Sequence, residues 1–318
     1  MSDLKKGDEM SINRLSSFLQ KKGMLQPRHM TSVNKHVFYV ETNHRERLIL
    51  KRHHNHSRVE QQWNFFEQQS SYIPVPFQRF PNQKPFLYDN GMYWTISPYI
   101  PGQKLNYMAE RDRVEALKSI QTFHNETEGI KLRYPLKKEI FYIRWYKRLQ
   151  NFRNTESIFK EYGFLGLYKD MVQTAEKHLQ YVSAYNWFEL ERAARKSGTW
   201  SHGDVASHNF IRYSGRIYLI DFDLLSCAPP LYDYIQLGQR FLPYLNWNAE
   251  RLLSYKIVQN KYLKPWLHAL FIPSDVMREW LYYIHSSPGR LMYGYLARMK
   301  EDWVKRQSFV KNAQNMLN

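Results

Sequence analysis

The strongest constraint on the fold lies between residues 200 and 223, where polar side chains follow β-prone apolar segments. Asp204 is followed five residues later by Asn209, and Asp221 ends the apolar run Ile217–Ile220. A loop on a rigid scaffold can place a carboxylate for proton transfer. A second carboxylate and an amide offer the hard oxygen ligands that Mg²⁺ prefers. The segment therefore predicts a strand and loop that carry a catalytic and metal-binding set.

The spacing of these residues matches a phosphotransferase pattern. An aspartate followed after five positions by an asparagine is typical of kinase catalytic loops, and an aspartate after the next strand binds the metal. We expect Asp204 to act as the base, and Asn209 and Asp221 to bind Mg²⁺, whereas Asp223 binds a second ion or contacts the acceptor. An ordinary turn with Asp and Asn caps is the alternative. We expect Asp233 to be structural and hydrogen-bonded to the backbone of this loop.

A lysine at the end of a strand is a second candidate. Lys51 ends the apolar strand Leu48–Leu50, where it can reach the phosphates of a nucleotide while a carboxylate on the next helix holds it. Glu60 is the best candidate for this carboxylate, and Glu67 is the fallback. The alternative is a solvated strand end beside Arg52.

The first hundred residues predict a small, mostly β lobe with one important helix. The expected elements are a helix over 10–22, a hairpin over 37–42 and 47–51, a helix over 57–69, and a second hairpin over 84–88 and 92–97. The second hairpin turns at Asp89-Asn90-Gly91, a strong hairpin signal. Residues 99–102 read as a linker.

After residue 100 the apolar residues recur at helical spacing. Helices are expected over 109–125, 137–160, 167–196 and 230–316, the last interrupted at Pro243, Pro265, Pro273 and Pro288, with strand and loop over 199–225. We therefore predict an α+β protein with an N-terminal nucleotide-binding lobe, residues 1–100, and a C-terminal catalytic and acceptor lobe, residues 101–318.

Charge and cysteine content narrow the partners. The net charge of +17 favours an anionic partner such as nucleotide phosphate, although a merely basic surface is equally compatible. No basic run with interleaved aromatic residues resembles a nucleic-acid-binding module, so nucleic acid is not the expected partner. The single cysteine, Cys227, excludes an internal disulfide framework. No apolar run reaches the ~18 residues that a membrane-spanning helix needs, and we expect a cytoplasmic protein without a membrane span.

At three segments the chain resembles the aminoglycoside phosphotransferase and choline kinase superfamily. These are Leu50-Lys51-Arg52, Ser201-His202-Gly203-Asp204-Val205-Ala206-Ser207-His208-Asn209-Phe210 and Ile220-Asp221-Phe222-Asp223. Within the superfamily they look most like the spore coat protein S branch of endospore-forming bacteria. The similarity of organisation extends from about residue 30 to the end of the chain. It implies a two-lobed, protein-kinase-like fold with ATP between the lobes.

The resemblance also implies roles for individual residues. Lys51 and Glu60 would form the phosphate-binding pair, and Ser97, Tyr99 and Ile100 would belong to the hinge beside adenine. By the same resemblance, Asp204 is the base, and Asn209 and Asp221 hold Mg²⁺. Members of this branch are coat components, so the resemblance implies localisation to the spore coat and coat proteins as partners.

One segment departs from the family. No glycine occurs between Gly23 and Gly91, although the phosphate-covering loop should lie near residues 32–36. A β-carbon hinders the close approach of backbone amides to phosphate. Asn34 and Lys35 are the expected substitutes, because Asn tolerates left-handed geometry.

Two functions remain open from the sequence, and enzyme activity itself is one of the open points. The first is an ATP- and Mg²⁺-dependent phosphotransferase that acts on a hydroxyl acceptor, either anionic or sugar-like. The second is a non-catalytic, kinase-fold structural or assembly component of the spore coat.

Overall fold

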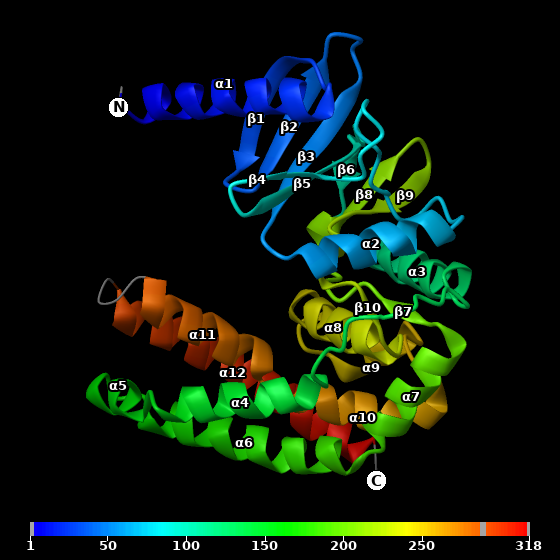
Figure 1. The fold of residues 1–318 in the computed structure, drawn as a ribbon. Helices are drawn as coiled ribbons and strands as arrows, with labels where there is room; N and C mark the ends of the chain where they lie inside the picture. The colour runs from blue at the N-terminus through cyan, green and yellow to red at the C-terminus, as the bar shows by residue number, and fades with distance from the viewer. Residues whose placement is uncertain (1–2, 287–290, 317–318) are drawn as a thin grey trace.

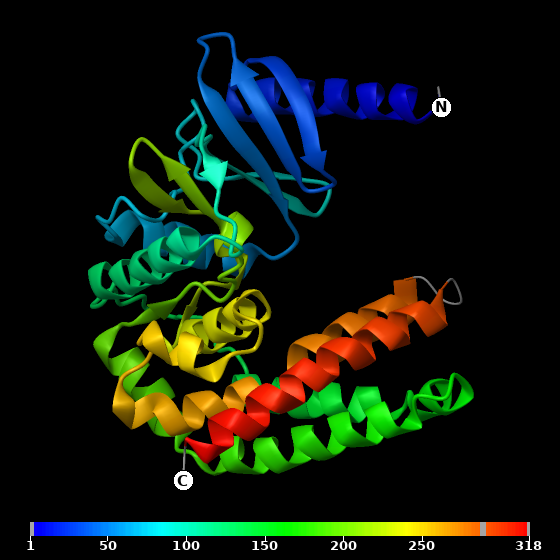
Figure 2. The same cartoon turned by 180° about the vertical axis from the view of Figure 1, so that it is seen from behind.

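A computed structural model of the chain describes residues 3–286 and 291–316 and shows two lobes (Figures 1 and 2). The upper lobe in Figure 1 holds a five-stranded antiparallel sheet in the order β1-β2-β3-β5-β4. Its strands are β1 (Pro27–Asn34), β2 (Val37–Thr42), β3 (Arg47–His53), β4 (Leu87–Asp89) and β5 (Met92–Pro98). Helix α1 (Asp3–Gly23) packs on this sheet, and Leu19 belongs to the same apolar core as the strands.

The register of the sheet decides which way Lys51 points. Leu48 and Leu50 of β3 are buried in the core beneath α1. Because successive side chains of a strand point to opposite faces, Lys51 lies on the other face. It pairs with Val37 of β2 and with Thr95 of β5, so it stands in the middle of the sheet. This face is turned toward the second lobe (Figure 1).

The second lobe is mainly helical. Its helices are α3 (Glu110–Glu126), α4 (Phe141–Arg153), α5 (Glu156–Glu161), α6 (Leu165–Ala184), α7 (Trp187–Ser197), α8 (Leu231–Phe241), α9 (Ala249–Ser254), α10 (Asn260–Phe271), α11 (Ser274–Ser286) and α12 (Met292–Asn315). Short strands β6 (Gln103–Lys104), β7 (Trp200–Ser201), β8 (Phe210–Tyr213), β9 (Arg216–Leu219) and β10 (Ser226–Cys227) form two small antiparallel sheets. The predicted α+β class with two lobes is confirmed.

Helix α2 (His56–Gln68) and the segment after it join the two lobes. Phe65 and Phe66 near the end of α2, together with Ile73, belong to the large core of the helical lobe. The amide of Leu219 in β9 donates to Ile73 (2.7 Å), and the amide of Val75 donates back to Leu219 (2.9 Å). The strand that precedes Asp221 is therefore bonded directly to a segment of the first hundred residues.

Several predicted boundaries were wrong. The helix expected over 137–160 is divided between α4 and α5, and the one over 167–196 is divided between α6 and α7. At the second break Asn186 caps α7, because its side chain accepts from the amide of Glu189 (3.2 Å). Pro265 does not interrupt a helix but lies within α10. Pro288 lies outside the described residues.

Helix length and composition bear on a membrane location. Among the helices that the structure describes, none combines the length and apolar character needed to cross a bilayer.

Candidate active site

The candidate catalytic loop, residues 202–209, begins with a turn that only glycine fits well. Gly203 follows β7 with a φ of +85°, and a β-carbon there would lie 2.5 Å from the carbonyl oxygen of Leu224. Asp233 at the start of α8 is fully buried and holds this turn. Its carboxylate accepts from the amides of His202 (2.7 Å) and Gly203 (2.8 Å), and from Nε2 of His124 (2.9 Å). The structural role predicted for Asp233 is confirmed.

The charge of Asp233 is stabilised by these donors. Burial by itself would raise the pKa of Asp233, but the hydrogen bond and charge of His124 and the amide of Gly203 outweigh it and hold the pKa below its usual value. The carboxylate is therefore ionised at neutral pH, which keeps the amides of the turn satisfied inside the protein.

His202 connects the catalytic loop to the strand before Asp221. Its Nε2 donates to the carbonyl of Ile220 (3.0 Å), and its Nδ1 accepts from the amide of Asp204 (3.2 Å). Burial lowers the pKa of His202, so the neutral ring carries its proton on Nε2. The sequence placed His202 beside Asp204 but did not suggest this role, which depends on a contact between separate segments.

Asp204 is half-buried, and one of its two oxygens is already engaged. Its Oδ1 accepts from Nη2 of Arg240 in α8 (2.6 Å), while Oδ2 makes no hydrogen bond with the described residues. Asn209 is buried, and its Nδ2 donates to the carbonyl of Asp204 (2.9 Å). Its Oδ1 is left for another partner. Sequence reasoning missed Arg240, which no motif singles out.

Asp221 and Asp223 lie beside the lysine of the upper lobe. Lys51 Nζ is 2.7 Å from Oδ1 of Asp221 and 2.8 Å from Oδ2 of Asp223. Burial by itself would lower the pKa of Lys51, but the charges and hydrogen bonds of the two carboxylates outweigh it and raise this pKa. In the same way, burial would raise the pKa of Asp221, but the charge and hydrogen bond of Lys51 lower it. Lys51 and Asp221 are therefore both charged at neutral pH.

The expected pair between Lys51 and Glu60 is not formed in this structure. Glu60 Oε2 lies 4.0 Å from Nδ1 of His56, and its side chain is 57% exposed. The reason is helical geometry, because α2 buries Val59 and Glu60 is rotated by about 100° from it. The fallback, Glu67, is bonded to Arg79. A role for Glu60 in nucleotide binding stays a prediction.

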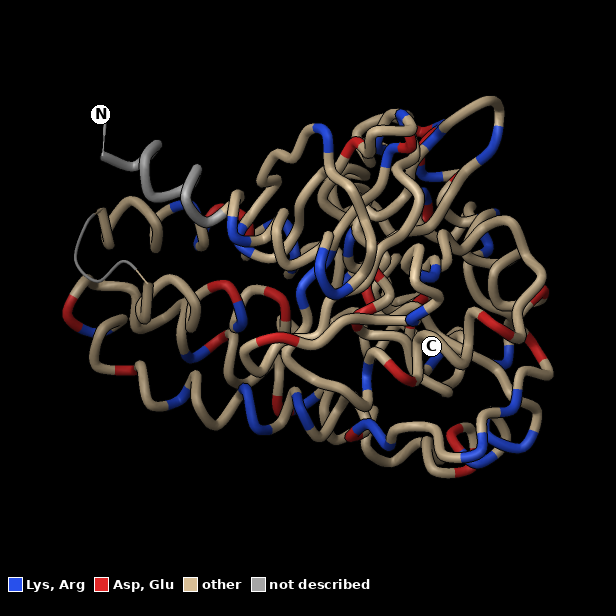
Figure 3. Tube along the Cα trace, turned by 45° about the horizontal axis from the view of Figure 1, so that its top comes forward, with Lys and Arg blue, Asp and Glu red and all other residues tan. Residues whose placement is uncertain are grey.

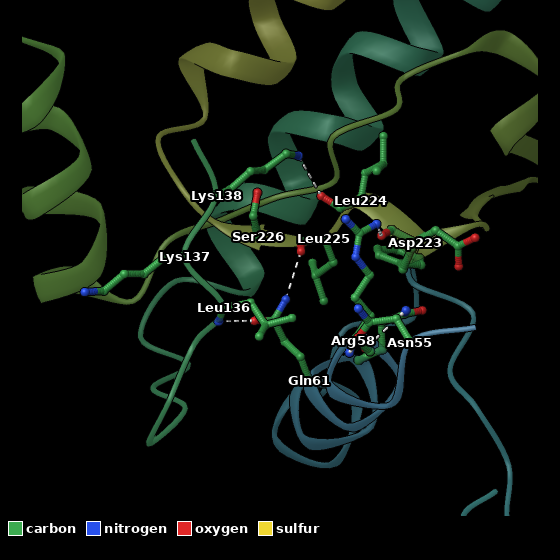
Figure 4. Close-up of a pocket in the computed structure, with 12 residues that line it drawn as sticks. Asn55, Arg58, Gln61, Leu136, Lys137, Lys138, Asp223, Leu224, Leu225 and Ser226 are labelled. Carbon is green, nitrogen blue, oxygen red and sulfur yellow. Dashed lines mark hydrogen bonds between the residues drawn. The ribbon is translucent and has the colours of Figure 1, made fainter. Parts of the chain in front are cut away.

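Gln61 is one of the residues of α2 that face the helical lobe. Its Nε2 donates to the carbonyl of Leu225 (2.9 Å), and its Oε1 accepts from the amide of Leu136 (2.7 Å). Figure 4 shows Gln61 between these two segments, with Arg58 reaching toward Asp223. The amide thus fixes α2 to the segment that carries Asp223.

The residues of the predicted hinge lie where the chain leaves the sheet. Ser97 is in β5, and Tyr99 follows it, with its amide donating to Arg47 (3.0 Å). The ring of Tyr99 packs edge-on against Tyr39, with 5.0 Å between centroids. Ile100 is half-buried. Contact of these three residues with adenine stays a prediction.

The segment expected to cover phosphate is the β1–β2 turn. Asn34 does not adopt the left-handed conformation expected for it; instead its Oδ1 accepts from the amide of His36 (2.8 Å). Arg52 of β3 fixes the turn, because its Nη2 donates to Lys35 (2.9 Å) and its amide donates to His36 (2.8 Å). The turn is thus closed by hydrogen bonds among its own residues and with Arg52.

Oxygen atoms suited to Mg²⁺ are available beside Lys51. Oδ1 of Asp223 is buried and accepts no hydrogen bond, and Asp221 and Asn209 lie on adjacent segments joined by the amide of Ile220 (3.0 Å to the carbonyl of Asn209). The described residues contain no cluster of three His, Cys, Asp or Glu side chains around one point. Mg²⁺ needs only one or two carboxylates when phosphates and water complete its shell, so these residues fit it.

A cavity of about 500 Å³ opens next to the catalytic loop. It is bounded by Gly203 and Ala206 of the loop, by Arg240 of α8, by one face of α4 and by the start of α11. Cavities of this size hold small molecules. Arg240 lines this cavity and is bonded to Asp204, and Gly203, the neighbour of Asp204, lines it as well, so the cavity lies close to Asp204.

Comparisons with known proteins agree with this geometry. Residues 32–255 match the model of a family described as the phosphotransferase enzyme family. Curated proteins give no sequence match to the chain. An aminoglycoside phosphotransferase from Alicyclobacillus acidocaldarius subsp. acidocaldarius DSM 446 has a similar structure, with 18% identity, a TM-score of 0.73, and coverage of 93% of this chain and 95% of that one.

Two ligand-bound structures share the same fold. An amicoumacin kinase in complex with AMP-PNP, Ca²⁺ and amicoumacin has 12% identity and a TM-score of 0.62, with 98% of this chain and 96% of that chain covered. A spectinomycin phosphotransferase in complex with ADP and spectinomycin has 13% identity and a TM-score of 0.58, with coverage of 90% and 93%. At such identities the likeness concerns the fold alone, and it agrees with the predicted kinase-like class.

Proposed function

Because the chain belongs to the phosphotransferase enzyme family, we propose that it transfers the γ-phosphoryl group of ATP to a hydroxyl group of a small acceptor. The observation that carries this proposal is the state of three oxygen-bearing side chains. Asp204 keeps one oxygen free, Asn209 keeps its amide oxygen free, and Asp221 lies against Lys51. Hydrogen bonds link the segments that carry these groups, since Asn209 is bonded to the backbone of Asp204 and to that of Ile220, and Lys51 of the upper sheet is bonded to Asp221.

We propose the following division of labour in the transfer. The acceptor oxygen forms a bond to the γ-phosphorus, and the bond from that phosphorus to the bridging oxygen of ADP breaks. The bridging oxygen keeps the electron pair, and the hydroxyl proton moves to Oδ2 of Asp204. Arg240 holds Oδ1 of the same carboxylate and thereby fixes its orientation.

The nucleotide would bind between the lobe of residues 1–100 and the lobe of residues 101–318. Ser97, Tyr99 and Ile100 would lie beside adenine, and Lys51 would contact the phosphates. Asn209, Asp221 and Asp223 would hold Mg²⁺. When bound, Mg²⁺ neutralises charge that develops on the transferred phosphoryl group.

Thermal unfolding with and without Mg²⁺-ATP tests this proposal. A ligand that binds only the native state raises the melting temperature, so Mg²⁺-ATP at 100 times its Kd should stabilise the fold by about 2.7 kcal/mol. Asp204→Asn should keep this shift but lose about 10²–10⁴-fold in turnover, because only the proton acceptor is removed. Asp221→Asn should lose most of the shift itself.

The exposed Asp302 of α12 provides a matched control, and Asp302→Asn should change neither the shift nor the turnover. Absence of any ATP-dependent shift in the unmodified protein, together with no turnover over a broad panel of hydroxyl acceptors, would refute the proposal.

A second candidate function is a structural or assembly role in the spore coat, after synthesis in the cytoplasm. The closed β1–β2 turn favours it, because the turn offers no glycine at which a phosphate could approach the backbone closely. A double variant with Asp204→Asn and Asp221→Asn separates the two functions in a spore-forming host. Normal coat assembly by this folded variant is expected for the structural role, and defective assembly would contradict it.

A further inference from the structure

The cavity beside the catalytic loop carries more positive charge than its own carboxylates can neutralise. Its basic side chains are Lys138, Arg144, Arg148, Arg240 and Arg278, and its acidic ones are Asp275 and Glu279. Two of these charges are already matched inside the protein. Arg240 is bonded to Asp204, and Asp275 is bonded to Arg306, 2.9 Å away. Glu279 lies 3.8 Å from Arg278, its neighbour in the sequence.

Three cations then remain without a carboxylate partner among the residues described. Lys138 Nζ donates only to the carbonyl of Leu224 (3.3 Å), and Arg148 Nη1 donates only to the carbonyl (2.9 Å) and hydroxyl of Ser274. The side chain of Arg144 forms no hydrogen bond or ion pair within the described part of the chain. Carbonyl and hydroxyl groups do not neutralise a positive charge. Carboxylates act on the three side chains only from beyond ion-pair distance: Glu139 and Glu191 on Arg144, Asp233 and Glu191 on Lys138, and Asp275 on Arg148. The three side chains thus form a cationic cluster without a carboxylate in direct contact.

The three side chains act on one another. Arg144 and Arg148 stand four residues apart on α4 and therefore share one face of the helix, and Lys138 lies just before the helix begins. Burial is the first cause that lowers the pKa of Lys138, to about 8, and the charge of Arg144 adds to it. Burial also lowers the pKa of Arg148 to about 10, with Arg278 and Arg144 adding to it. An anion placed among them would favour their charged forms and so oppose the lowering of these pKa values.

We propose that the acceptor carries a phosphate group in addition to the hydroxyl that receives the new phosphoryl group, and that Lys138, Arg144 and Arg148 bind this phosphate. The substrate class is thus a small phosphorylated polyol or sugar. Three cations match the double charge of a phosphate monoester better than the single charge of a carboxylate, and guanidinium groups bind phosphate oxygens in pairs.

The same arrangement excludes a cationic acceptor. An aminoglycoside-like molecule would bring ammonium groups next to three unpaired cations at short range, where repulsion is only weakly screened. The walls of the cavity also contain Trp145 and Tyr232, which can pack on the ring or carbon chain of a polyol. This inference rests on the proposed function for its hydroxyl end, but the phosphate-binding cluster can be tested without ATP.

Binding of inorganic phosphate, glucose 6-phosphate, glucose and gluconate should be measured by isothermal titration calorimetry at constant ionic strength. We expect inorganic phosphate and glucose 6-phosphate to bind, and glucose to bind at least ten times more weakly than glucose 6-phosphate. Arg144→Gln should weaken binding of both phosphates at least tenfold, because one of three cations is lost. This variant breaks no hydrogen bond of the described protein, so its folding should be unaffected.

Lys137→Gln is the matched control. Lys137 is exposed next to Lys138, and Figure 4 shows that its side chain points away from Leu224, toward which Lys138 reaches. Lys137→Gln should bind phosphate like the unmodified protein, and Lys138→Gln should be weakened as Arg144→Gln is. The proposal is overturned by phosphate binding that survives both Arg144→Gln and Lys138→Gln, by an absence of phosphate binding, or by tighter binding of gluconate than of glucose 6-phosphate.

These outcomes are independent of phosphoryl transfer. A protein that binds glucose 6-phosphate through Arg144 but shows no shift with Mg²⁺-ATP would support the phosphate cluster and contradict the proposed activity. Efficient turnover of a neutral or cationic acceptor would support the proposed activity and contradict the phosphate-binding cluster.

Discussion

At the residue scale, the candidate site is organised by which polar atoms already have partners. Asp233 is fully buried and has both oxygens bonded, which marks it as a support of the loop. Asp204 and Asn209 each have one polar atom bonded and one oxygen free. A side chain must be held by one atom to present another in a defined direction. The free oxygens are the ones that the proposed proton transfer and metal binding would use.

Gly203 provides a test of the catalytic turn against a matched glycine. Gly203 and Gly215 have φ values of +85° and +74°, but a β-carbon would meet Leu224 only at Gly203, since nothing lies within 4 Å at Gly215. Gly215→Ala should cost about 1–2 kcal/mol of unfolding free energy from backbone strain alone. Gly203→Ala should cost at least about 3 kcal/mol, because the oxygen it meets belongs to the backbone. Urea unfolding measures both, and equal losses would show that the close approach to Leu224 is unimportant.

At the element scale, α6, α10 and α12 are held together around a buried histidine. His178 of α6 is 1% exposed, with its Nδ1 3.2 Å from Nδ1 of His268 in α10 and its Nε2 3.3 Å from the amide group of Gln314 in α12. Burial lowers the pKa of His178 to about 3, and the neighbouring His268 adds to this effect. The contact between these helices is therefore favoured when the ring of His178 is neutral.

This contact should make stability depend on pH. In the unfolded chain His178 takes up a proton near pH 6.5, while the folded chain resists it down to about pH 3, so between these values the unfolded state binds more protons. Its contribution to stability should be complete above pH 6.5 and fall by about 2 kcal/mol from pH 7 to pH 5. Urea unfolding at the two pH values should show a smaller loss for His178→Gln.

Other buried histidines also contribute to the pH dependence, so the difference between variants is the informative quantity. His44, exposed in the turn before β3, is the control, and His44→Gln should keep the full loss. A loss that is the same in His178→Gln and in the unmodified protein would contradict the assignment to this histidine.

The elements that were predicted correctly are those with a strong local pattern. The strands around Lys51 largely alternate buried and partly buried residues, and the Asn90-Gly91 turn adopts the left-handed geometry that this pair favours. Strand β1 was missed because Met30 is its only buried residue. It lies at the edge of the sheet, where pairing with β2 decides the structure.

At the scale of the whole molecule, the lobes are joined by polar contacts around the site. Lys51 bridges to Asp221 and Asp223, and Gln61 bonds both the segment after Asp223 and Leu136. Each contact fixes the sheet relative to the catalytic loop. Binding of a metal ion or a phosphate group next to Lys51, Asp221 and Asp223 would therefore alter the contacts that position the two lobes relative to each other.

The excess of positive charge has no single location. Figure 3 shows Lys and Arg positions spread over both lobes and interspersed with acidic ones. The net charge of +17 is thus a property of the whole surface, and it does not by itself identify an anionic partner. The cluster of Lys138, Arg144 and Arg148 is distinguished by its lack of carboxylate partners inside a cavity.

The sequence by itself was enough to identify the polar residues between 200 and 223 as a candidate site, because that prediction depends on spacing within one short segment. It also determined the two-lobed class, since strand and helix periods are local. Only the tertiary structure decided the partner of Lys51. Asp221 lies 170 residues away from it, and helical geometry turned the expected Glu60 toward solvent. The cationic cavity likewise depends on which charges are neutralised across the fold, and no local pattern contains that information.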